Sequence, residues 1–258
     1  MFYKPVIKDH LLWLNDAGRN RFYQETIIAN CKGKVCVDVG AGSGILTDYA
    51  LEAGASKVYC VEIRKARANF LKEKYQNKNV IILEEDFLNT RTNDADVFFI
   101  EQIGCQFNND FSIKKFMSHI KKNNPEAMTL PNRYMIKAYI FDGMIEDQPQ
   151  MLVDSRYLPA GFYEHCQTQM SMNPTEILPV YELNRGNVDQ DITFSLDLSH
   201  YKDCTIFFDD DVYFNDHRCE YENVYRCSMW DKPYKVYLKD CRSKMEFFWD
   251  KEFKIKKT

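Results

Sequence analysis

Three glycines at alternating positions, Gly40, Gly42 and Gly44, constrain the fold of this chain more than any other feature. They follow the apolar run Val35–Val39 and precede Ile45–Ala53, whose apolar spacing is helical. Because glycine has no Cβ, it lets the backbone turn tightly and come close to a ligand. The pattern therefore predicts a buried strand, a tight turn and a helix, which together begin an α/β fold.

An acidic residue follows the next predicted strand. Val58–Val61 is a second apolar run, and Glu62 comes directly after it, 18 residues past Gly44. In βαβ nucleotide sites, an acid about 20 residues past the glycines binds ribose hydroxyls at the carboxyl end of the sheet. A dinucleotide site has the spacing G-x-G-x-x-G, whereas this turn reads G-x-G-x-G. It resembles the turn of S-adenosylmethionine (SAM)-dependent methyltransferases, although an unrelated βαβ turn is also compatible with the pattern.

The composition limits the classes of protein to which the chain can belong. Hydrophobic residues make up 45% and charged residues 28% of its 258 residues, as in packed globular proteins of one large or two small domains. The net charge of −4 argues against a nucleic-acid binder that relies on a broad basic face. No apolar run approaches the roughly 18 residues of a membrane span, so we expect no membrane partner.

The cysteines and the first residues indicate the compartment. None of the nine cysteines forms a C-x-x-C pair, so a structural zinc site has no support and we expect no metal. The start, Met1–Pro5, is not followed by the apolar segment of a signal peptide. Reduced cysteines fit a cytosolic protein. We therefore expect a cytoplasmic location, or a nuclear one if the source is eukaryotic.

Two further strand ends carry acids. Val80–Leu83 ends near Glu84, Glu85 and Asp86, and an acid there can accept a hydrogen bond from an adenine amino group. Each of the three is equally compatible with a solvated turn.

Glu101 directly follows the apolar run Ala95–Ile100. A carboxylate in that position is partly desolvated, so it needs a cation, hydrogen-bond donors or a raised pKa. Glu101 is therefore the strongest catalytic candidate, although an acid that caps a loop is the competing interpretation. Asp110 follows nine residues later, before a predicted helix, where a structural N-cap is about as well supported as a functional role.

The two ends of the chain differ in character. Residues 8–30 are predicted to be helical, with Gly18 interrupting the pattern. From pattern alone, Arg19 is best interpreted as a surface arginine paired with Asp16. After Pro131, short strand-like runs without intervening helices predict an antiparallel sheet or barrel, with residues 142–175 as an insertion. These runs are Tyr134–Phe141, Ile177–Leu183, Ile192–Leu198, Cys204–Phe208 and Lys235–Leu238.

The chain resembles the protein arginine methyltransferases. Five stretches are similar to the family's N-terminal helix, its cofactor loop, its loop with two glutamates, its junction into a β domain and its Thr-His-Trp loop. In that order they are His10–Arg19, Asp38–Leu46, Glu101–Gly104, Leu130–Arg133 and Ser228–Trp230. The resemblance is specific over residues 10–105 and thin beyond residue 135.

This resemblance implies a SAM site. Arg19 matches the arginine that holds the carboxylate of the cofactor, Glu62 matches the ribose acid, and Asp86 falls where the family keeps an adenine-binding acid. The implied cofactor residues are Arg19, Asp38, Gly40, Gly42, Gly44, Glu62 and Asp86.

It also implies a site for an arginine side chain. Glu101 matches the first of the family's two glutamates, and the second falls at Asp110, which is one methylene shorter. Two carboxylates are needed to grip both edges of a guanidinium, so this departure bears on activity. Trp230 is kept in the substrate-binding loop, whereas the family's histidine is Met229 here.

The expected architecture is a Rossmann-like SAM-dependent methyltransferase domain at 1–130, followed by an antiparallel, barrel-like β domain at 131–258 for substrate binding and dimerisation. The implied function is N-methylation of arginine in a protein or peptide, by a homodimer. Two alternatives stay open, namely a methyltransferase acting on a different acceptor and a weak or non-catalytic relative that keeps the fold.

Overall fold

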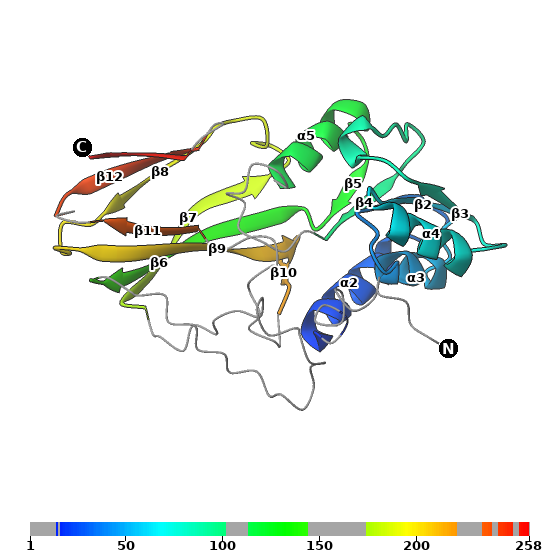
Figure 1. Cartoon of the computed structure of the whole chain (residues 1–258), viewed down its shortest axis with the longest axis horizontal. Coiled ribbons are helices and arrows are strands. Elements are labelled where there is room, and N and C mark those ends of the chain that lie inside the picture. Colours follow the sequence, from blue (N-terminus) through cyan, green and yellow to red (C-terminus); the bar gives the residue numbers. More distant parts are fainter. Residues whose placement is uncertain are drawn as a thin grey trace.

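The computed structural model describes residues 14, 16–101, 113–143, 174–220, 234–238, 242–249 and 253–257. A parallel sheet with helices lies beside a longer region built of antiparallel strands (Figure 1). The parallel sheet ends at Leu130, a cis peptide joins Leu130 to Pro131, and the first antiparallel strand begins at Arg133. The predicted Rossmann-like sheet followed by an antiparallel region is confirmed.

The strand order of the parallel sheet places two predicted site segments side by side. The order is β3-β2-β1-β4-β5, so the two strands that precede the glycine turn and Glu101 are neighbours. Val39 at the end of β1 pairs with Ile100 at the end of β4. Gly40 and Glu101 therefore leave the sheet next to each other. The five strands are β1 (Val35–Val39), β2 (Lys57–Val61), β3 (Val80–Leu83), β4 (Val97–Ile100) and β5 (Met128–Leu130).

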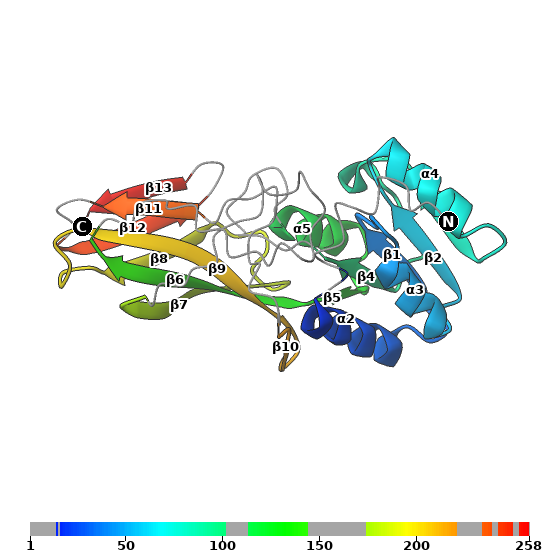
Figure 2. The ribbon, with the colours of Figure 1, turned by 60° about the horizontal axis from the view of Figure 1, so that its bottom comes forward.

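The described helices pack around this sheet (Figure 2). They are α2 (Ala17–Asn30), α3 (Ile45–Glu52), α4 (Lys65–Lys74), the short 3-10 helix η2 (Phe87–Asn89) and α5 (Ile113–Asn123). The predicted break between two helices falls two residues before Gly18, because Leu14 is helical, Asp16 is not, and Gly18 lies in the first turn of α2. The helix begins one residue earlier, where the Asp16 carboxylate accepts a hydrogen bond from the backbone N–H of Arg19 and so caps its N-terminus.

The antiparallel region contains two sheets. One has the order β10-β9-β6-β7, with β11 also pairing with β9, and the other has the order β13-β12-β8. The strands are β6 (Arg133–Asp142), β7 (Glu176–Asn184), β8 (Ile192–Asp197), β9 (Cys204–Phe214), β10 (His217–Arg218), β11 (Tyr234–Leu238), β12 (Lys244–Trp249) and β13 (Phe253–Lys257).

Strand β9 is longer than the predicted Cys204–Phe208 because its acidic middle is neutralised. Asp211 is only 2% exposed and pairs with Lys137 of β6 and with Arg218 of β10. Because these cations neutralise a buried acid, the strand continues through Asp209–Asp211, where the acidic composition predicted its end.

The two regions share one hydrophobic core. Phe22 and Tyr23 of α2 belong to the same buried cluster as Leu183 and Val212 of the antiparallel sheet. Arg185 also crosses the junction, since its guanidinium donates to main-chain oxygens between α5 and β5, at 3.0 Å for the carbonyl of Asn124. This packing fixes the antiparallel region against the parallel sheet and its helices.

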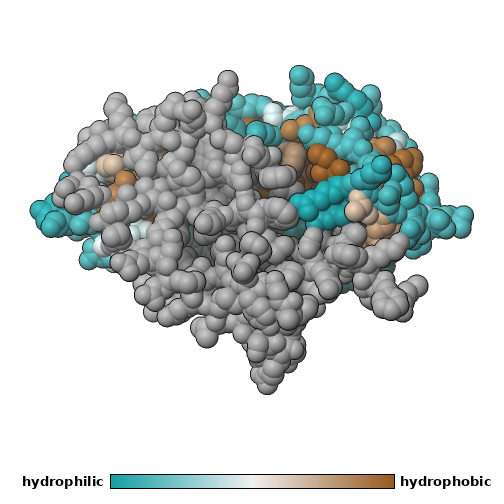
Figure 3. Space-filling view, viewed as in Figure 1, coloured by the Kyte–Doolittle hydropathy of each residue, from teal (hydrophilic) through white to brown (hydrophobic). Residues whose placement is uncertain are grey.

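One face of the molecule shows where polar and apolar side chains lie on the surface. Over the part of the chain that is coloured by hydropathy, hydrophilic side chains predominate around smaller apolar patches (Figure 3). Within the described ranges, no helix is both long enough and apolar enough to cross a membrane.

Candidate cofactor and acceptor site

The glycine turn connects β1 to α3 through left-handed backbone. Gly40, Gly42 and Gly44 have φ values of 71°, 54° and 76°, a region that residues with a Cβ rarely adopt. The turn is tied to the end of β2, because the backbone N–H groups of Gly40 and Ala41 donate to the Val61 carbonyl at 2.9 and 3.0 Å. The predicted turn is therefore present, and its shape depends on glycine.

Glu62 lies at the carboxyl end of β2 and is only 3% exposed. One carboxylate oxygen accepts the Gly42 N–H at 3.0 Å, and the other accepts the Arg64 N–H at 2.8 Å. Glu62 thus holds the glycine turn itself. A carboxylate has about four lone-pair positions, so both oxygens can still accept hydrogen bonds from ribose hydroxyls.

Asp38 is 2% exposed inside β1 and binds the first turn of α3. One of its carboxylate oxygens accepts hydrogen bonds from the backbone N–H of Thr47 at 3.1 Å and from its hydroxyl at 2.7 Å. Burial raises the pKa of Asp38 to about 7, and the negative charge of Glu101 adds to this while the Thr47 hydroxyl opposes it. Asp38 therefore ties β1 to the start of α3, on either side of the glycine turn.

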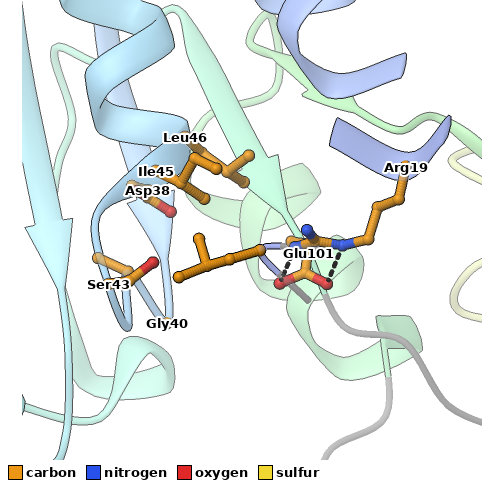
Figure 4. A pocket seen from close by; sticks show the side chains of 9 residues that line it. Arg19, Asp38, Gly40, Ser43, Ile45, Leu46 and Glu101 are labelled. Carbon is orange, nitrogen blue, oxygen red and sulfur yellow. Dashed lines mark hydrogen bonds and ion pairs between the residues drawn. The ribbon is translucent and has the colours of Figure 1, made fainter. Parts of the chain in front are cut away.

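Arg19 and Glu101 form a bidentate ion pair between α2 and the end of β4 (Figure 4). The Arg19 Nε donates to Glu101 Oε1 at 3.0 Å, and Nη2 lies 2.8 Å from Oε2. Arg19 is 2% exposed, and the Glu101 side chain is 23% exposed. Removal from water raises the pKa of Glu101, while the Arg19 charge opposes that shift.

The interpretation of Arg19 as a surface residue paired with Asp16 is therefore wrong. The guanidinium is buried, and the contact with Asp16 is made by the Arg19 backbone N–H. Its partner, the Glu101 carboxylate, lies 82 residues away in the sequence. A pattern of spacing within one helix cannot indicate such a pair.

The predicted residues do not all meet. Arg19, Asp38, Gly40 and Glu101 line one pocket, together with residues that the motif analysis did not single out. Those additional residues are Leu14, Ala41, Ser43, Ile45 and Leu46. Apart from Leu14, they lie within the glycine motif or at the start of the helix that follows it. Their place in the motif was the signal from which the sequence could have predicted that they line the pocket.

Asp86 is not among the described residues that line this pocket. Asp86 is half-buried, and its carboxylate accepts the Leu88 N–H at 3.0 Å, which caps η2. The predicted residues Asp110, Met229 and Trp230 lie outside the described part of the chain.

Ile63 is a candidate that sequence reasoning missed. It directly follows Glu62 and is 64% exposed, more than any other large apolar side chain in the described ranges. An exposed β-branched side chain beside the predicted ribose-binding acid can cover one face of a nucleobase. The available signal was an apolar residue immediately after the strand-end acid.

The raised pKa of Asp38 predicts a pH-dependent stability. The folded state holds a proton on Asp38 up to about pH 7, whereas the unfolded chain releases it near the ordinary value of 3.8. The free energy of unfolding therefore loses the contribution of this proton as the pH rises from 4 through 7, by up to a few kcal/mol. Asp38→Asn keeps an oxygen acceptor for Thr47 but cannot ionise. Urea unfolding at pH 5 and pH 8 measures the free energy of unfolding of the parent and of Asp38→Asn. The variant should gain stability relative to the parent at pH 8, and the same difference between the two proteins at both pH values would contradict the raised pKa of Asp38.

Comparisons with known proteins match the chain to methyltransferases. Residues 11–135 match the family model described as FtsJ-like methyltransferase. Histone-arginine methyltransferase CARMER of Aedes aegypti is 32% identical over 130 residues, which is 46% of this chain and 21% of that protein. Ribosomal RNA small subunit methyltransferase A of Mesomycoplasma hyopneumoniae (strain J) is 40% identical over 91 residues, which is 33% of this chain and 32% of that protein. The matches thus span about a fifth and a third of these relatives.

The likeness in fold extends over the whole chain. A crystal structure of PRMT6-SAH superposes with a TM-score of 0.63 at 19% identity, covering 97% of this chain and 98% of that one. The shared fold includes both the parallel sheet and the antiparallel region. In sequence the chain is thus similar to methyltransferases, histone-arginine methyltransferases among them, and it shares its two-part fold with PRMT6.

Proposed function

We propose that this chain binds SAM at the glycine turn and transfers its methyl group to a nitrogen of a protein arginine. The observation that carries the proposal is the Arg19–Glu101 pair, which lies in one pocket with the turn. It brings together a cation suited to the carboxylate of the cofactor and a carboxylate suited to a guanidinium. These two groups come from segments that the sequence resemblance had assigned separately.

The described residues offer a partner for each part of SAM. Arg19 would bind the carboxylate, the Gly40–Gly44 turn would pass close to the methionine part, and Glu62 would accept the ribose hydroxyls. Asp86 and Ile63 would contact the adenine, by a hydrogen bond and by apolar cover respectively. The fit rests on the left-handed glycines, which leave no Cβ at the turn, and on the buried Glu62 beside them. Bound SAM supplies an electrophilic methyl group on a sulfonium.

Glu101 would position the acceptor. Arg19 uses one hydrogen-bonding direction on each Glu101 oxygen, and the remaining lone pairs can accept a second guanidinium. Asp110 is proposed as the second carboxylate. Because arginine does not readily lose its proton, the site would act by holding one nitrogen in line with the methyl group and by stabilising the positive charge, with the proton leaving late.

Calorimetry tests the cofactor assignment directly. We expect the full chain to bind SAM and S-adenosylhomocysteine, and not NAD, because Ile45 stands where the G-x-G-x-x-G spacing of a pyrophosphate site has its last glycine. Heat of binding with NAD and none with SAM would contradict the proposal.

A second acceptor class has one specific observation in its favour. The match at 40% identity carries the name ribosomal RNA small subunit methyltransferase A, so ribosomal RNA is the alternative acceptor. The net charge of −4 weighs against it, because RNA binding relies on cationic surface. A non-catalytic relative would bind SAM and methylate neither substrate.

Assembly and location remain proposals. We propose a homodimer, on the basis of the family resemblance and of the apolar residues in segment 142–175, most of which lies outside the described residues. Static light scattering at tens of micromolar would test it, since a dimer forms by mass action. The proposed location is cytoplasmic or nuclear. The cysteines of the parallel-sheet region support it, since Cys31, Cys36 and Cys60 are free thiols.

A further inference from the structure

A cluster of charged and hydroxyl groups packs against the far end of the glycine turn. Lys74 ends α4, Tyr75 follows it, and Asp48 lies in α3. The Lys74 Nζ donates to the Ser43 carbonyl at 2.9 Å and to the Asp48 carboxylate at 2.6 Å. The Tyr75 hydroxyl lies 2.6 Å from the Gly44 carbonyl oxygen and 3.0 Å from Asp48 Oδ1.

The contact between α4 and the turn is unusually close. A Cβ built on Gly44 would lie 2.4 Å from the Tyr75 hydroxyl and 2.9 Å from a methyl carbon of Leu71. Tyr75 is 3% exposed. Its burial and the charge of Asp48 raise its pKa, so the hydroxyl keeps its proton and remains a donor. Gly44 is thus required by its φ of 76° and also by the tyrosine that touches it.

The turn is therefore held from two sides. On one side, Val61 at the end of β2 and Glu62 just after it bind the backbone of Gly40, Ala41 and Gly42. On the other side, Lys74 and Tyr75 bind the carbonyl oxygens of Ser43 and Gly44.

We propose that Tyr75 and Lys74 are positioning residues for cofactor binding, acting through Ser43 and Gly44 without touching the cofactor. This inference rests on the proposed function, because it takes the turn to be the SAM site. Ser43 lines the pocket, so a shift of its carbonyl displaces the pocket wall. A turn of three left-handed glycines has much conformational freedom, and affinity gains when that freedom is restricted before binding.

The chain contains a matched control. Lys57, Tyr59 and Asp94 form a second lysine–tyrosine–aspartate cluster, with Lys57 Nζ 2.9 Å from the Tyr59 hydroxyl and that hydroxyl 3.1 Å from Asp94 Oδ1. Lys57 is 25% exposed and Lys74 is 27% exposed, so the two lysines are similarly accessible. Lys57 begins β2, whereas Glu62 follows its end, which separates the control from the turn by the length of the strand.

The test compares Tyr75→Phe and Lys74→Met with Tyr59→Phe and Lys57→Met in the full chain. Each change removes the hydrogen bonds of one polar group. Calorimetry with S-adenosylhomocysteine should show about three- to tenfold weaker binding for the first two variants, as expected for losing one or two net hydrogen bonds, and unchanged binding for the controls. Turnover at saturating SAM should stay within about twofold of the parent, because no acceptor contact changes.

Thermal melts separate positioning from general destabilisation. The inference is supported if binding weakens in the two turn variants while their melting temperatures fall no further than those of the controls. It is overturned if all four variants bind like the parent, or if binding weakens equally in the controls. Should Tyr75→Phe fail to fold, the half-exposed Lys74→Met decides the outcome alone. A parent chain that does not bind S-adenosylhomocysteine would overturn the proposed function and this inference with it. A parent chain that binds, with turn variants that bind equally well, would overturn this inference alone.

Discussion

Glu101→Gln is expected to lower the rate of methyl transfer to an arginine-rich protein by about 10²–10³, the usual loss for one electrostatic stabiliser in a desolvated site. The substitution keeps the shape of the side chain and one oxygen acceptor, but it removes the charge that holds a cationic acceptor. The Arg19 Nε can still donate to the amide oxygen, so binding of SAM should remain close to that of the parent. Rate assays with radioactive SAM, together with calorimetry on the same preparations, measure both quantities.

Asp110→Asn is the companion variant for this experiment. If Asp110 contributes a second carboxylate, the rate should fall, though less than in Glu101→Gln, because the shorter side chain reaches an acceptor less directly. If Asp110 is a helix N-cap, activity and stability should both persist, since Asn caps as well as Asp. Full activity in Glu101→Gln would refute the role proposed for that carboxylate.

Arg19→Met should have the largest effect on the folded protein. It leaves the Glu101 carboxylate without the guanidinium that now satisfies both of its oxygens. Removing one partner of a buried pair costs roughly 3–5 kcal/mol, and we expect the low end because the Glu101 side chain keeps 23% exposure. Affinity for SAM should fall about 10- to 100-fold, as for the loss of hydrogen bonds to a charged group. Urea unfolding and calorimetry measure the two losses.

The double variant Arg19→Met with Glu101→Gln separates an unpaired charge from lost packing. Because it carries no uncompensated carboxylate, its free energy of unfolding should recover part of what Arg19→Met loses. Lowering the pH should likewise reduce the deficit of Arg19→Met, because Glu101 then takes up a proton. Strictly additive losses at every pH would show that the pair is not a coupled unit.

The parallel sheet could be predicted because its signals are local. The glycine spacing, the apolar runs and the strand-end acids all lie within a few residues of the elements that they mark. The edge-to-edge position of Gly40 and Glu101 then follows from strand order, which βαβ units limit strongly. The antiparallel region gave weaker signals, and β10, β12 and β13 were missed. Strand β9 contains an acidic run, and its buried Asp211 pairs with Lys137 of β6 and with Arg218 of β10, contacts that depend on how these strands pair.

The candidate site was predictable in its residue types but not in its contacts. Arg19 and Glu101 were each identified, yet their pairing depends on how α2 packs against β4, and this is a tertiary contact. Glu62 was identified from spacing, but its bond to the Gly42 N–H depends on the conformation of the turn. Ile63 and the Lys74–Tyr75 cluster were missed because their importance comes from exposure and from helix packing.

The most direct test of the central claim is transfer of a radioactive methyl group from SAM by the full chain to a defined acceptor. Three acceptors should be compared, namely an arginine-rich peptide, the same peptide with every arginine replaced by lysine, and a ribosomal RNA fragment. The account predicts label in the arginine peptide alone, and its loss in Glu101→Gln. Label in the lysine peptide or the RNA but not in the arginine peptide, or no label in any of the three, would contradict it.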